Sequence, residues 1–69
     1  MDAYLFHIRR DGREVLDLQV TICRDDDAAR HRAQALLLEA HDRSRVEVSR
    51  GEWSVAVVER PRIQLVQGL

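Results

Sequence analysis

Three histidines, one cysteine and a run of three aspartates are the residues of this chain that could support catalysis or metal binding. His31 and His41 fall on a predicted helix, about 80° apart around its axis and roughly 15 Å apart along it. That separation is too large for a shared metal ion. His7 lies on a predicted strand, so the three imidazoles do not predict a metal site.

The other chemical candidates are Cys23 and the run Asp25-Asp26-Asp27. A thiol nucleophile needs a positioned base, and the sequence places none beside Cys23. Carboxylate oxygens suit a hard cation, but three consecutive side chains entering a helix diverge by about 100° each. Capping is the simpler interpretation, with Asp25 or Asp26 as the N-cap. We predict no catalytic residue, no metal site and no cofactor, and expect that the protein is not an enzyme.

Arginines gather at two predicted turns, where they could contact an anion or a nucleic acid: Arg9, Arg10, Arg13, Arg60 and Arg62. The two groups share one end of the sheet if residues 45–49 form a strand, and lie at opposite ends if they form a loop. Phosphate contacts favour a net positive charge, whereas this chain carries a net charge of −1. The aspartate run also occupies a helix N-terminus, where phosphates often bind. The pattern therefore does not favour nucleic-acid binding.

The composition predicts a single small domain over residues 1–69. All eleven basic residues are arginine, and a single cysteine allows no intrachain disulfide. We find no signal-peptide pattern and no apolar run of the roughly 20 residues that span a bilayer. We expect a cytoplasmic protein that does not bind membranes.

The periodicity predicts strand, strand, helix, strand, strand. Alternating runs cover about 3–9 and 14–23, on either side of an Asp11-Gly12 turn. A helix follows to about His41, with a stripe of alanines and leucines at helical spacing. Further strands are expected near 53–58 and 63–66, whereas 45–49 remains either a short strand or a loop. The fold class is α+β, a two-layer ββα(β)ββ unit with a mainly antiparallel sheet and one helix packed on one face.

Alternation assigns the large apolar residues to the two faces of this sheet. We expect a shared core of Phe6, Leu18, Leu36, Leu37 and Trp53. The face away from the helix should carry Leu5, Val15, Cys23, Ala56 and Val58. So many apolar residues on one open face indicate that a partner covers it. Of these, Leu5, Val15, Ala56 and Val58 are the candidate interface.

The chain resembles a family of short, mostly proteobacterial domains of unknown function. The likeness rests on Tyr4-Leu5-Phe6-His7-Ile8-Arg9 before Asp11-Gly12, on Ala28-Ala29-Arg30, and on Trp53 before Val55-Ala56-Val57. Arg10 departs from the pattern as an extra residue in the first turn, and Val20 stands where relatives often have glycine. The resemblance implies the fold but supplies no activity, ligand or catalytic residue.

Taken together, these features favour a non-catalytic protein-interaction or self-association module of bacterial origin. A homodimer is the simplest form, because one self-complementary patch serves both copies. The edge segment 63–66 could pair across such a dimer instead. A nucleic-acid-binding or antitoxin-like regulatory domain is the alternative.

Overall fold

The computed structural model describes residues 1–11 and 16–60 of the chain. Its elements are β1 (Asp2–Arg10), β2 (Leu16–Cys23), α1 (Asp26–Leu38), β3 (Arg43–Arg50) and β4 (Trp53–Glu59). The predicted α+β fold is confirmed. Segment 45–49 lies within β3, so it is a strand and not a loop. The predicted strand near 63–66 lies outside the described residues.

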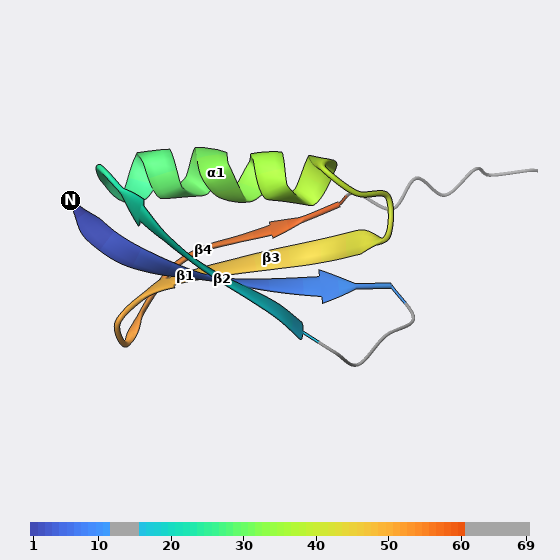
Figure 1. Cartoon of the computed structure of the whole chain (residues 1–69), viewed down its shortest axis with the longest axis horizontal. Helices are drawn as coiled ribbons and strands as arrows, with labels where there is room; N and C mark the ends of the chain where they lie inside the picture. The colour runs from blue at the N-terminus through green and yellow to red at the C-terminus, as the bar shows by residue number, and fades with distance from the viewer. Residues whose placement is uncertain (12–15, 61–69) are drawn as a thin grey trace, which may run out of the picture.

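The four strands form one sheet in the order β2-β1-β3-β4, and all neighbouring strands are antiparallel. Figure 1 shows α1 running along one side of this sheet. The helix packs mainly on β3 and β4 and makes fewer contacts with β1 and β2. Among the residues that the structure describes, the two edges of the sheet are therefore β2 and β4, and β2 is the edge that the helix covers less.

The core lies between α1 and the helix-facing side of the sheet. Its buried apolar residues are Tyr4, Phe6, Ile8, Cys23, Ala29, Ala33, Leu36, Leu37, Val46 and Val48. Two of the helical positions that face the sheet are alanines, and their small side chains let the helix lie close to the strands. The predicted burial of Phe6, Leu36 and Leu37 is confirmed.

The helix begins where the sequence predicts and ends earlier. Asp25 is the N-cap, and its Oδ1 accepts a 2.8 Å hydrogen bond from the amide of Ala28. The helix ends at Leu38, before the predicted end at His41. The Glu39 amide then donates to the Leu36 carbonyl at 3.3 Å, which tightens the last turn.

The predicted orientation of β2 was wrong. Even-numbered residues of β1 pair with odd-numbered residues of β2, as in Phe6 opposite Gln19. Because paired residues point to the same face, Gln19 lies on the helix side, whereas Leu18 lies on the outer face. Leu18 is 59% exposed and does not belong to the core. Cys23, expected on the outer face, is buried on the helix side opposite Asp2.

The predicted orientation of β4 was also wrong, because a β-bulge interrupts its alternation. Ala56 pairs with Val48, but Ser54 pairs with Ser49, so Val55 is an extra residue between them. Val58 pairs with the buried Val46. Ala56 and Val58 consequently pack against the core instead of lying on the outer face. Trp53, expected in the core, is 72% exposed beside the turn.

Candidate interaction surface

The outer face of the sheet carries an apolar patch along the edge strand β2. We call Leu5, Leu18, Val20 and Ile22 the outer patch. Three of these side chains are largely exposed: Leu18 at 59%, Val20 at 70% and Ile22 at 68%. Leu5, half-buried on β1, pairs directly with Val20 and joins the row to the neighbouring strand. The patch is therefore continuous over two strands.

The other half of the outer face is charged. On β3, the guanidinium of Arg45 lies 3.1 Å from the carboxylate of Glu47 and 3.7 Å from that of Glu59 on β4. His7 on β1 separates this region from the patch, since it pairs with Leu18 on one side and Glu47 on the other. The outer face thus divides into an apolar half at β2 and a mainly ion-paired half at β3 and β4, where Val57, paired with Glu47, is apolar and 47% exposed.

One of the four predicted interface residues lies in the outer patch. Leu5 is on the predicted face, and Val15 lies outside the described residues. Ala56 and Val58 lie on the opposite face, against the core. Sequence reasoning missed Leu18, Val20 and Ile22, although a signal was available. A two-residue hairpin loop pairs residues of opposite parity, so an Asp11-Gly12 turn already sets even positions of one strand opposite odd positions of the other.

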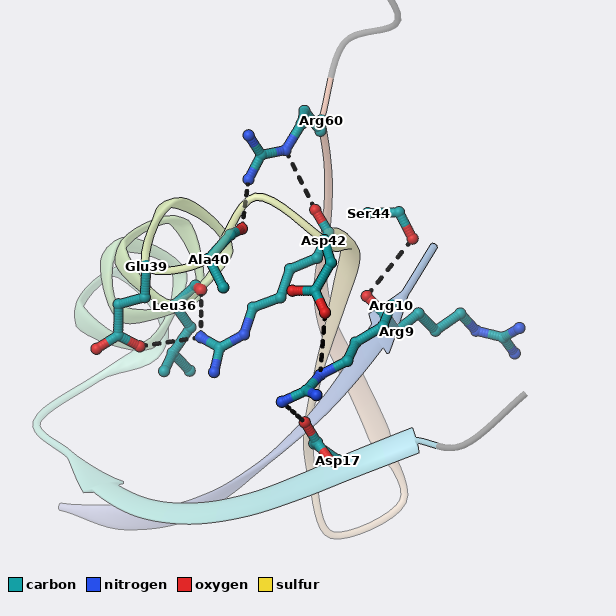
Figure 2. Close-up of polar contacts among 10 residues, drawn as sticks. Arg9, Arg10, Asp17, Leu36, Glu39, Ala40, Asp42, Ser44 and Arg60 are labelled. Carbon is teal, nitrogen blue, oxygen red and sulfur yellow. Dashed lines mark hydrogen bonds and ion pairs between the residues drawn. The ribbon is translucent and has the colours of Figure 1, made fainter. Parts of the chain in front are cut away.

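The described arginines of the two groups, Arg9, Arg10 and Arg60, lie at one end of the sheet, as expected if 45–49 is a strand. Of these, Arg10 and Arg60 use their charge internally, as Figure 2 shows. Arg10 lies 2.8 Å from Asp17 and 3.9 Å from Asp42. Arg60 donates hydrogen bonds to the carbonyls of Leu37 (2.6 Å) and Ala40 (3.0 Å). These guanidiniums hold the fold together at this end.

Arg9 differs from these arginines. Its backbone carbonyl accepts a 3.5 Å hydrogen bond from the hydroxyl of Ser44, while its exposed side chain extends away from the other arginines (Figure 2). Arg13 and Arg62, the remaining predicted contacts, lie outside the described residues. The surface therefore presents less free positive charge here than the sequence indicates.

The remaining chemical candidates do not converge. His31 and His41 are exposed, while His7 is half-buried in the outer face. In residues 1–11 and 16–60, no three histidine, cysteine, aspartate or glutamate side chains lie close enough to hold a metal ion together. Asp25 caps the helix, and Asp26 accepts a hydrogen bond from Tyr4. The aspartate run is thus explained by capping and by one tertiary contact.

A family model described as a domain of unknown function (DUF6894) matches residues 3–66. The chain belongs to this family. The match spans nearly the whole sequence and includes the helix and all the described strands apart from Asp2, the first residue of β1. Among curated proteins and among solved structures, nothing matches. No helix within the described part of this DUF6894 chain has the length and apolarity to cross a membrane.

Proposed function

We propose that this DUF6894 domain is a non-catalytic interaction module that self-associates as a homodimer through the outer patch. The observation that carries the proposal is the row of Leu18, Val20 and Ile22 on the face opposite the helix, each more than half exposed. An antiparallel sheet with one wet face usually places polar residues there. Removing three aliphatic side chains in one row from water lowers the free energy and so favours association.

The size of the chain supports self-association. A domain of this length buries only about 60% of the surface that its unfolded form exposes, and association with a second copy adds stability by mass action. A two-fold dimer needs one self-complementary patch.

The net charge and the ion pairs of the arginines do not favour nucleic acid as the partner. The net charge is −1, and Arg10 and Arg45 at the end of the sheet are paired with carboxylates. A non-catalytic role is supported by the placement of the reactive groups, since the Cys23 thiol is buried, and His31 on the helix and His41 after it are both exposed.

Sedimentation equilibrium across a series from low to high micromolar protein tests the proposal, with two matched variants. Val20→Lys places a charge in the outer patch, and in a two-fold dimer it sets two lysines close together. Leu38→Lys makes the same change at a side chain that is 75% exposed at the end of the helix, outside the patch. We expect wild type and Leu38→Lys to dimerise and Val20→Lys to remain monomeric. A wild type that stays monomeric throughout, or a Val20→Lys variant that dimerises equally well, overturns the proposal.

A further inference from the structure

We infer that the second copy joins at the edge of β2, antiparallel to it, so that the two sheets continue as one. This inference rests on the proposed self-association and specifies its geometry. The joined sheet would have the order β4-β3-β1-β2 followed by β2-β1-β3-β4 of the second copy. The competing geometry stacks the two outer faces on one another.

The regularity of β2 supports edge pairing. An exposed strand edge is a template for another strand, and proteins usually block it with bulges, prolines or charges. β2 pairs with β1 over its whole length without a register shift. It contains one charged residue, Asp17, which is already ion-paired to Arg10. β2 thus has no bulge and no proline, and its one charge is already paired within the molecule.

The other edge strand shows the contrast. β4 has a register shift against β3 at Val55, ends in Glu59, and is followed in the sequence by Pro61. Bulges, charges and proline are the features that prevent edge pairing. Of the two edges, β2 is therefore the one suited to receive a second copy.

The helix leaves space for a second strand beside β2. Because α1 packs mainly on β3 and β4, it lies toward the other side of the sheet. The helix-side residues of β2 include Gln19 and Thr21, which are half-buried and polar. A second β2 can approach in the plane of the sheet and meet these short polar side chains.

The pattern of β2 also sets the register. With a two-fold axis perpendicular to the sheet, the outer faces of both copies lie on the same side of the joined sheet. Paired residues point to the same face, so even-numbered residues of one β2 pair with even-numbered residues of the other. If the axis passes through Val20, Val20 lies opposite Val20 of the second copy, and Leu18 lies opposite Ile22 of the second copy. Cross-strand apolar pairs of this kind stabilise a sheet. The polar Gln19 then lies opposite Thr21 of the second copy, on the helix side.

Charge favours this antiparallel arrangement over a parallel one. Asp17 lies near the start of β2, and Arg24 follows its end, with a side chain that is 82% exposed. An antiparallel pair centred on Val20 places Asp17 opposite Cys23 of the second copy, next to its Arg24. Opposite charges therefore adjoin at both ends of the junction, whereas a parallel pairing would bring like charges together.

Disulfide cross-linking in a Cys23→Ala background tests the geometry. Directly opposite residues of antiparallel strands have Cα atoms about 4.5–5.5 Å apart, within the range of a disulfide. Stacked sheets lie about 10 Å apart on average, but disulfides do join facing residues of packed sheets. The cross-link therefore tests proximity at Val20, and hydrogen exchange separates edge pairing from stacking. We expect Val20→Cys to form a cross-linked dimer under mild oxidation. It should form at least about ten-fold faster than for the collisional control Leu38→Cys, because neighbouring thiols reach millimolar effective concentration.

Two further readouts separate the possible failures. Gln19→Cys should cross-link more slowly than Val20→Cys, because the two copies of residue 19 do not lie opposite each other when the axis is at Val20. If Gln19→Cys cross-links faster than Val20→Cys, the proposed register is wrong. Amide hydrogen exchange should slow with rising concentration at alternate residues of β2, those whose N–H points away from β1. A sedimenting dimer without this alternation overturns edge pairing, whether or not Val20→Cys cross-links, but leaves the proposed self-association standing. A monomer overturns both.

Discussion

At the scale of single residues, Tyr4 links the sheet to the start of the helix. Its ring is fully buried, and its hydroxyl donates a 2.7 Å hydrogen bond to Oδ1 of Asp26 in the first turn of α1. The same oxygen lies 3.6 Å from Arg50 of β3, which also lies 3.6 Å from Asp2. A phenol, two carboxylates and a guanidinium thus connect β1, α1 and β3.

This contact predicts a stability change at alkaline pH. The hydrogen bond to Asp26, burial of the ring and the negative charge of Asp26 raise the pKa of Tyr4 from 10.0 to about 12. The folded pKa is above the unfolded one, so the stabilisation is fully present below about pH 10 and is lost as the pH rises through about 12. We expect urea melts of wild type to weaken over this range, whereas those of Tyr4→Phe should not.

The chain is well suited to this measurement. It contains one tyrosine and no lysine, so Tyr4 is the only side chain whose ordinary pKa lies near 10. Phenolate absorbance should titrate with a midpoint of about 12 in the folded protein and about 10 in urea. Equal midpoints in the two states would show that the contact with Asp26 does not hold in solution.

At the scale of elements, the C-terminus of α1 is held by arginines from outside the helix. The last turn contains no basic residue. Instead, Arg43 of β3 donates to the Leu36 carbonyl at 2.6 Å and to Glu39 at 3.0 Å, and Arg60 donates to the carbonyls of Leu37 and Ala40. Cations are favourable at this end of the helix dipole, and the terminal carbonyls need donors.

Replacing Arg60 should therefore cost stability. We expect Arg60→Met to reduce the free energy of unfolding by about 1.5–3 kcal/mol, the range for hydrogen bonds to a charged group. Arg9→Met is the matched control, because the exposed Arg9 side chain extends into solvent, and it should change stability by less than about 0.5 kcal/mol. Urea melts followed by circular dichroism compare the two; similar losses would show that Arg60 does not act as a cap.

Sequence reasoning predicted the elements of this domain better than their orientation. Alternation and helical spacing located β1, β2, α1 and β4, because each depends on local periodicity. The face that a strand presents depends on its pairing partner. Leu18 was assigned to the core because its strand alternates as regularly as β1, but the register across the hairpin places it outside.

The sequence predicts that the outer face is apolar, but it does not identify most of the residues that form the candidate surface. An apolar outer face was expected and is present, yet of its members only Leu5 was named in advance. The bulge at Val55 carried Ala56 and Val58 to the helix side. No local feature of an alternating run such as Ser54–Val58 indicates a bulge, since both faces of that segment carry small or apolar side chains.

At the scale of the whole molecule, the charge distribution predicts that the domain does not bind nucleic acid specifically. Affinity for nucleic acid comes mainly from unpaired cations that contact phosphates, but the net charge is −1. At the basic end, Arg10 and Arg45 contact carboxylates, and Arg60 contacts helix carbonyls. Releasing Arg60 to phosphate would remove its contacts with the helix, and releasing Arg10 or Arg45 would break ion pairs within the sheet.

Fluorescence anisotropy with short single-stranded and double-stranded probes tests this prediction. We expect at most weak binding at low salt, and its loss at physiological ionic strength, where exposed charges are screened beyond about 8 Å. Arg9→Met should weaken what remains, since the Arg9 side chain extends freely into solvent. Submicromolar binding that persists at physiological salt would contradict the prediction. It would mean that the arginines at this end exchange their internal partners for phosphates, and it would make this end, and not the outer patch, the functional surface.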